Sequence, residues 1–213
     1  MSRLFHKTPT RGGKLRRDLV CFLLLGVLGW VLLDFPCFTQ QQAFEALEGR
    51  NFYGEGQVLR TLEGENGHQY RITRAGHACA WEQVWPVLFS RFLWQPGRME
   101  IVPDDPSTPL VALPVDADFL PGVVAVLCHD SSIVRVTAEY PALSNAPEAE
   151  GWQKILLSST DCRNNCFLLT APAEEAAFLD AQATDALVLT GYNHEGAVVW
   201  RSPQPDWSFY GWK

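Results

Sequence analysis

Lysine is scarce beyond the first 17 residues of this 213-residue sequence, where only Lys154 and Lys213 follow. Residues 35–213 carry 11 basic and 22 acidic side chains, a net charge of about −11. Clustered Lys and Arg are what attract a phosphate backbone. This segment is therefore not expected to bind nucleic acid.

Local catalytic motifs are also missing. The sequence contains no G-x-S-x-G, no H-E-x-x-H and no Gly-rich phosphate loop. The run His129 to Ser131 has the residue types of a catalytic triad, but three consecutive side chains cannot converge as a triad does. Asp104-Asp105 and the pair Asp116 and Asp118 are typical of solvated turns. We therefore predict no catalytic residue and no cofactor.

One long apolar run is present. It extends from Leu19 to Leu33, and residues 35–38 prolong it past Asp34. At ~1.5 Å per helical residue, the prolonged run covers the ~30 Å hydrocarbon core of a bilayer. Six basic residues precede it: Arg3, Lys7, Arg11, Lys14, Arg16 and Arg17. This charge asymmetry predicts a cytoplasmic N-terminus and a translocated C-terminal segment.

A cleavage site is absent after this run. No small-x-small pair follows it, and "DFPC" has Asp and Pro where a lipoprotein signal carries small residues. We predict an uncleaved transmembrane signal-anchor at residues 18–38, after a basic cytoplasmic flank at residues 1–17. The alternative, a buried helix of a soluble domain, is disfavoured because the run lacks a polar stripe. Residues 39–213 would then form an extracytoplasmic domain, with the lipid bilayer as partner of residues 18–38.

The sequence also lacks any Asn-x-Ser/Thr acceptor. A eukaryotic secretory domain of this size would often carry one. The absence favours a bacterial protein of the cell membrane, with a single span.

Residues 39–213 are predicted to be α+β and β-rich, with mostly antiparallel sheets and two or three short helices. Thr39 to Gln42 has capping-box spacing, which predicts a helix ending at Gly49. Asn66-Gly67 predicts a hairpin turn. Residues 123–128 are apolar throughout and predict a central strand, and residues 134–140 alternate as a half-buried strand does, with residues 129–132 as the turn between the two.

Other elements are predicted from proline positions and from short apolar runs. Pro86 favours a strand before it and a short helix after it, and Pro172 predicts a further helix through "AEEAAFLDAQ". Strands are also expected at "WQKILLSS", "CFLLT", "ALVLTGY" and "AVVWRS". Residues 141–151, rich in Pro, Ala, Ser and Glu, form either a sub-boundary between two domains or a long loop.

The predicted domain contains four cysteines. Cys162 and Cys166 enclose a turn-prone Arg-Asn-Asn spacer, so a local disulfide between them is one interpretation and free thiols are the other. A zinc site built from His77, Cys79, Cys128 and His129 is disfavoured, because structural zinc sites usually use two close Cys pairs. We predict no metal.

The C-terminal segment "PQPDWSFYGWK" is rich in aromatic residues: Trp207, Phe209, Tyr210 and Trp212. These side chains either cover the domain's own sheet or contact a partner, because aromatic residues are favoured at interfaces. The whole sequence favours an anchored binding or accessory module for another protein. A membrane-tethered hydrolase with a site built from distant residues is the alternative.

Overall fold

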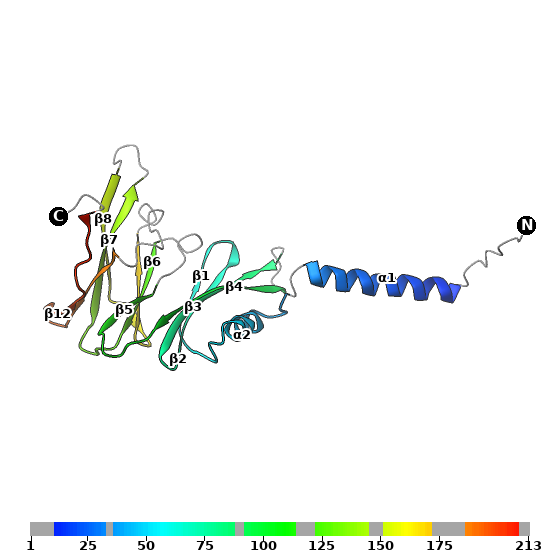
Figure 1. Ribbon diagram of the computed structural model, residues 1–213, viewed down its shortest axis with the longest axis horizontal. Coiled ribbons are helices and arrows are strands. Elements are labelled where there is room, and N and C mark those ends of the chain that lie inside the picture. The colour runs from blue at the N-terminus through cyan, green and yellow to red at the C-terminus, as the bar shows by residue number, and fades with distance from the viewer. Residues whose placement is uncertain are drawn as a thin grey trace, which may run out of the picture.

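The computed structural model describes residues 11–32, 36–87, 92–113, 122–144, 151–171 and 186–208. The long helix α1 (Arg11–Leu32) extends away from a layered, β-rich body (Figure 1). Every strand pairing within the described residues is antiparallel. The prediction of an α+β, β-rich fold with mostly antiparallel sheets is therefore confirmed.

The described strands of the body form three four-stranded sheets. The first sheet has the order β1-β2-β3-β4, formed by β1 (Gln57–Glu63), β2 (Gln69–Ala75), β3 (Ala78–Pro86) and β4 (Trp94–Pro103). The second has the order β5-β6-β10-β9, formed by β5 (Leu110–Leu113), β6 (Val123–Cys128), β10 (Cys166–Thr170) and β9 (Cys162–Arg163). The third has the order β12-β11-β7-β8, formed by β12 (Val198–Arg201), β11 (Val188–Tyr192), β7 (Arg135–Ser144) and β8 (Gly151–Ser159).

The second sheet is the central layer. Side chains of one of its faces, such as Leu127 and Cys166, pack against Tyr70 and Trp81 of the first sheet. Side chains of the opposite face, such as Phe167, pack against the third sheet. Period-two alternation lets one strand supply two cores in this way. The layers follow one another along the body from the α1 end to β12 (Figure 1).

A short helix, α2 (Gln40–Arg50), covers the outer face of the first sheet. Its N-cap Thr39 accepts a hydrogen bond from the Gln42 backbone N–H at 3.1 Å, as the capping-box spacing predicted. The Gln42 side chain in turn accepts from the Phe38 N–H at 3.2 Å, one residue earlier than in an ideal box. Ala43, Phe44 and Leu47 are buried, and the helix ends one residue beyond Gly49.

Several predicted elements agree with the structure. Asn66 and Gly67 both have positive φ, 57° and 77°, in the turn between β1 and β2. β6 is buried on both faces in the middle of its sheet. Residues 141–144 and Gly151 of the predicted break belong to β7 and β8, which pair with each other. Residues 145–150 lie outside the described residues.

One predicted neighbour relation differs. β6 belongs to the second sheet and β7 to the third, so residues 129–132 cross between layers and do not close a hairpin. The strand before Pro86 extends to include that proline. The helix predicted after Pro86 falls largely on residues 88–91, and the helix predicted from Pro172 falls on residues 172–181. Both lie outside the described residues.

The N-terminal helix has other bounds than the predicted segment 18–38. It begins earlier, at Arg11, and its described part ends at Leu32, whereas Cys37 already pairs with Trp94 of β4. Residues 36–38 thus belong to the edge of the β-rich body. Among the helices of the described residues, none combines the length and the apolar character needed to cross a membrane.

Candidate functional site

A pocket of about 630 Å³ opens beside the first sheet. Its wall is formed by the start of α2, the β1–β2 hairpin and the adjoining ends of β3 and β4, through Gln40, Glu63, Asn66, Gly67, Gln69, Pro86 and Trp94. The volume lies in the range of about 300–1,000 Å³ that is typical of small-molecule sites. Among the described residues, helix, strand and tight-turn elements hold the wall.

A polar cluster supports this wall from within the sheet. The fully buried side chain of Gln83 donates to the Tyr70 hydroxyl at 2.9 Å and lies 3.1 Å from Nδ1 of His68. The His68 ring stacks on Trp85, with ring centroids 5.8 Å apart. These contacts hold the hairpin that carries Asn66, Gly67 and Gln69 against the sheet.

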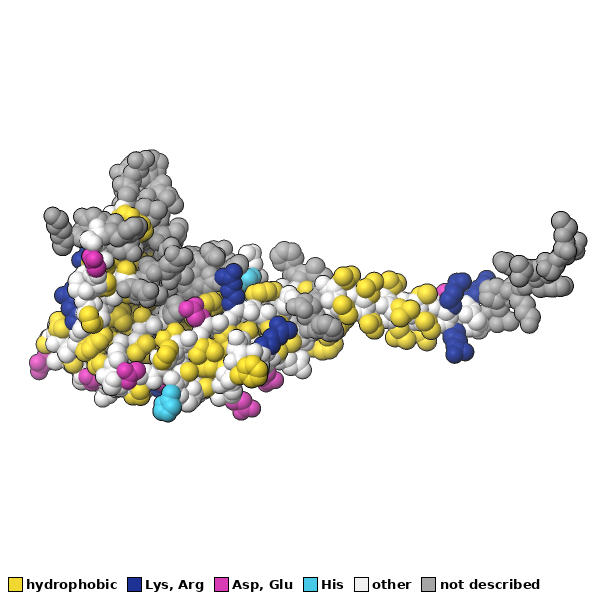
Figure 2. All heavy atoms as spheres, viewed as in Figure 1, with side chains coloured by type: hydrophobic (Ala, Val, Ile, Leu, Met, Phe, Trp, Pro, Cys, Tyr) yellow, Lys and Arg dark blue, Asp and Glu magenta, His cyan; other side chains and the backbone are white. Residues whose placement is uncertain are grey.

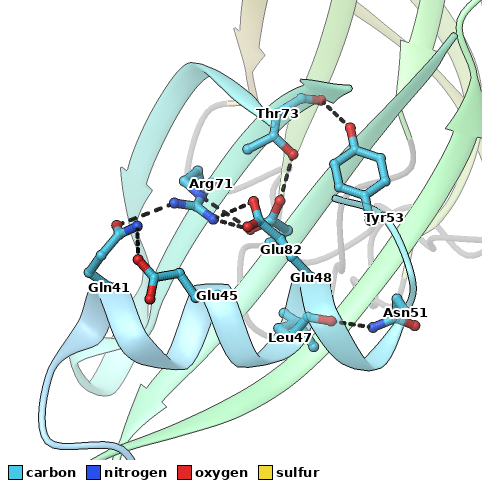
Figure 3. A network of polar contacts seen from close by, with 9 residues as sticks. All are labelled: Gln41, Glu45, Leu47, Glu48, Asn51, Tyr53, Arg71, Thr73 and Glu82. Carbon is cyan, nitrogen blue, oxygen red and sulfur yellow. Dashed lines mark hydrogen bonds and ion pairs between the residues drawn. The ribbon is translucent and has the colours of Figure 1, made fainter. Parts of the chain in front are cut away.

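A second polar cluster lies under α2 (Figure 3). The guanidinium Nη2 of Arg71 is 2.8 Å from both Glu48 of α2 and Glu82 of β3. The Thr73 hydroxyl donates to the other oxygen of Glu82 at 2.5 Å. Arg71 also lies over the ring of Phe44, 4.2 Å from its centroid. These contacts join α2 to the first sheet.

Burial has the largest effect on the pKa values of Glu82 and Tyr53 in this cluster. It raises the pKa of the Glu82 carboxyl, although Thr73 and Arg71 oppose the shift. Burial also raises the pKa of Tyr53 to about 12. The Tyr53 hydroxyl lies 3.1 Å from the carbonyl oxygens of Thr73 and Ala78. Such a closed set of contacts is suited to fixing a helix rather than to turning over a substrate.

A third cluster combines residues from three separate segments. Asp104 lies 2.8 Å from Nε of Arg74 and 2.9 Å from Nε2 of His129. The contact with Arg74 is an ion pair, and the contact with His129 is one when the imidazole is protonated. Asp104 is buried, so its prediction as a solvated turn residue was wrong. Arg74, near the end of β2, and Asp104, directly after β4, lie at the same end of the two strands that flank β3. A contact across an intervening strand has no local signature in the sequence.

The thiol of Cys79 completes this third cluster beside Arg74 and Asp104. Its side chain is fully buried, and that burial raises its pKa to about 11, against the opposing effect of Arg74. A nucleophilic cysteine instead needs a lowered pKa and access to substrate. Asp104 interacts with both the thiol of Cys79 and the imidazole of His129, but the arrangement favours a structural cluster of charged groups.

One family model matches residues 36–210, which is most of the chain. It describes a domain of unknown function, DUF5044. The chain belongs to the DUF5044 family. No curated protein and no solved structure shows significant similarity to it. The DUF5044 match begins at Pro36, where the β-rich body begins, and so includes the pocket and leaves out α1.

The cysteines of the DUF5044 domain are free thiols in this structure. Cys162 pairs with Phe167 and Cys166 with Arg163 across the β9–β10 hairpin. Since directly paired residues share a face and successive residues alternate, the two thiols point to opposite sides of the hairpin. Cys162 is exposed and Cys166 is buried. This register disfavours the predicted disulfide between them.

Metal ligands do not gather within the DUF5044 domain as far as it is described. No group of three or more His, Cys, Asp or Glu side chains among the described residues is placed to hold an ion. The alternative zinc set therefore gains no support from the geometry.

The C-terminal aromatics are described only in part. Trp207 is buried against Ala186 and Val188 on the third sheet, and its indole N–H donates to the Ala186 carbonyl at 2.9 Å. The Lys154 ammonium lies 4.8 Å from the centroid of its ring. Phe209, Tyr210 and Trp212 lie outside the described residues. For Trp207, the contacts favour a cover over the domain's own sheet.

Proposed function

We propose that this protein is a membrane-anchored binding or accessory module, with its N-terminus in the cytoplasm and its β-rich domain outside. The domain would stand at the membrane surface, where it contacts another protein. The observation that carries this proposal is the exposed apolar surface of α1.

None of the residues of α1 is buried. Its apolar side chains remain 48–76% exposed: Leu15, Leu19, Val20, Phe22, Leu23, Leu24, Leu25, Val27, Leu28, Val31 and Leu32. Figure 2 shows apolar side chains along the visible side of the helix. Covering such a surface is favourable by roughly 25 cal/mol per Å². A lipid bilayer is the cover that suits a helix with apolar side chains all round.

The charges of α1 fit the proposed orientation. Lys and Arg side chains gather at its N-terminal end, and the segment after the helix is acidic (Figure 2). The apolar residues 19–32 rise only ~21 Å, less than the ~30 Å core. Arg16 and Arg17 can extend their ends towards the cytoplasmic interface. Trp30 and Phe38, with ring centroids 4.8 Å apart, would lie at the outer interface.

The third sheet supplies the surface for a protein partner. Its edge strands are β8 and β12. Leu156 of β8 is 61% exposed and Val198 of β12 is 58% exposed. Within the described residues these two strands each have one neighbour in the sheet. A strand edge with apolar side chains is a common template for strand addition by another chain.

A topology experiment tests this proposal. The full chain with a C-terminal tag is expressed in bacteria, and protease is added to spheroplasts. We expect loss of the tag and retention of the N-terminal segment in the membrane after an alkaline carbonate wash. A tag that stays protected would contradict the orientation.

A matched pair of variants tests the role of α1 in the same assay. Leu24→Arg combined with Val27→Arg should release the chain from the carbonate-washed membrane, because two central charges oppose insertion. Leu156→Arg combined with Val198→Arg places the same charges on exposed positions of the β-rich body and should leave it in the membrane. Equal behaviour of the two variants would contradict anchoring by α1.

The tethered hydrolase remains the alternative prediction. The meeting of Cys79, Asp104 and His129 is the observation that bears on it. Reaction of the native full chain with a fluorophosphonate or an iodoacetamide reporter, followed by mapping of the labelled residue, tests it. Selective labelling of Cys79 would favour the hydrolase over the binding module.

A further inference from the structure

The pocket beside the first sheet has a distinctive set of polar groups. Its lining residues include three with a side-chain amide, Gln40, Asn66 and Gln69, and one with a carboxylate, Glu63. Each amide offers two N–H donors and a carbonyl acceptor. A ligand that matches this wall must itself both donate and accept several hydrogen bonds.

Charge narrows the ligand class. The residues that line the pocket in the described part of the chain include no Lys, Arg or His. Phosphate and carboxylate ligands are usually held by such cations. The single carboxylate of Glu63 further opposes an anion. The pocket is thus suited to an uncharged ligand rich in hydroxyl groups.

Apolar surface lies on the same wall. Trp94 and Pro86 are both partly exposed and line the pocket as paired residues of β4 and β3. Trp94 is fixed by two backbone hydrogen bonds with Cys37, at 2.7 and 2.8 Å. Trp94 also packs against Ala43, Phe44 and Val84. Since aromatic side chains supply rigid apolar contact area, the part of the indole that lines the pocket can contact the C–H face of a ring.

We propose that this pocket binds a neutral oligosaccharide. A pyranose ring combines an apolar C–H face with a rim of hydroxyl groups, which are donors and acceptors at once. An organic amine, held by Glu63 and the Trp94 ring, is the competing ligand. The three amides favour hydroxyl groups, because an ammonium group can only donate. The inference concerns the β-rich domain and does not depend on the membrane anchor.

The wall is also built to keep its shape, which reduces the entropy cost of binding. Asn66 and Gly67 occupy the tight turn with positive φ, a conformation that residues other than Gly, Asn and Asp rarely adopt. His68, next to that turn, is held by Gln83 and Trp85. The residues that would contact the sugar are thus positioned before it binds.

Saturation-transfer NMR on the full chain tests the proposal. The protein is kept in a zwitterionic detergent, because glucoside and maltoside detergents would compete for the pocket. The ligands are the β-linked N-acetylglucosamine tetramer, cellotetraose and maltotetraose, with glucose 6-phosphate and spermidine as the anionic and amine comparisons. We expect saturation of ring C–H protons in at least one neutral tetramer and none in glucose 6-phosphate.

Variants locate the binding site. Gln69→Ala and Trp94→Leu should each weaken binding of that tetramer at least tenfold. Gln57→Ala, on an exposed position of β1, and Trp152→Leu, on the third sheet, are the matched controls and should bind as the wild type does. Circular dichroism checks that each variant is folded. If Trp94→Leu does not fold, Gln69→Ala alone decides.

Three outcomes overturn the proposal. The first is the absence of saturation in all three neutral tetramers. The second is tetramer binding that the Gln69→Ala variant leaves unchanged. The third is binding of spermidine alone, which would assign the pocket to amines.

Discussion

At the scale of single residues, the least ordinary feature is the charge buried between α2 and the first sheet. Arg71 forms ion pairs with the carboxylates of Glu48 and Glu82, and Glu82 has no exposed surface. Removing water from such groups costs several kcal/mol for each ion, and only close contacts offset that cost. The cluster therefore contributes little net stability as a whole but makes each member hard to replace alone.

Replacing Arg71 by Met should destabilise the fold strongly. The substitution leaves Glu48 and Glu82 buried without their cation, and losing one member of a buried pair costs about 3–5 kcal/mol. Urea unfolding of the full chain in zwitterionic detergent, followed by circular dichroism, measures this cost. Arg163→Met removes an exposed ion pair with Asp161 and should cost about 1 kcal/mol or less. Equal costs for the two variants would contradict the proposed role of Arg71.

Thiol labelling should separate the cysteines by burial. Burial raises the pKa of Cys166 to about 12, so little reactive thiolate forms at pH 8. Burial also raises the pKa of Cys162, against the opposing effect of Arg60, but this side chain is exposed and accessible to the reagent. We expect N-ethylmaleimide to modify Cys162 in the native full chain and to leave Cys79 and Cys166 unmodified. In denaturant all six cysteines should react. If the denatured chain carries only four N-ethylmaleimide groups, with Cys162 and Cys166 unmodified, these two cysteines form a disulfide.

At the scale of elements, local signals in the sequence predicted what the structure contains. The Thr39 cap, the Asn66-Gly67 turn and the apolar strand at residues 123–128 each depend on contacts within a few residues. Pairing between distant strands was not predictable in this way. β6 pairs with β10 and β7 with β11, because burial against other layers selects the partners. Alternation reveals that a strand has two faces but not which sheet covers each face.

The polar sites were not predictable from local sequence either. Asp104 and His129 both stand in loops, where solvated side chains are the usual interpretation. The fold brings these loops to one end of neighbouring sheets and buries the carboxylate. The pocket likewise joins residues from 40 to 94, none of which forms a recognisable motif. Such sites depend on topology, which a single sequence specifies only through its long-range packing.

The cap of α2 offers a test at the element scale. Thr39→Ala removes the acceptor for the Gln42 N–H and should lower the free energy of unfolding by about 1 kcal/mol. Thr39→Ser keeps the hydroxyl and should retain most of that stability. Urea unfolding of both variants gives the comparison. If the Ala and Ser variants unfold alike, the capping bond is not what stabilises the start of α2.

At the scale of the whole molecule, three stacked sheets leave two outer faces to be covered. Phe44 and Leu47 of α2 are buried over the first sheet. On the third sheet, Trp207 packs beside Ala186 and Val188. The tail thus has a role comparable to that of α2 at the opposite end of the stack. α2 precedes the strands in the sequence and Trp207 follows them. Each can therefore pack onto sheets whose strands have already paired.

Truncation after Ser202 should therefore destabilise the full chain. The loss removes the buried indole of Trp207 and its hydrogen bond to Ala186, and truncation of a buried Trp costs about 3–5 kcal/mol. Trp207→Ala alone should reproduce most of this loss in urea unfolding. Trp152→Ala, which replaces a 37% exposed Trp on β8, is the control and should cost clearly less. If truncation leaves stability unchanged but removes a protein that cross-links to the wild-type chain in cells, the tail aromatics are contacts for a partner instead.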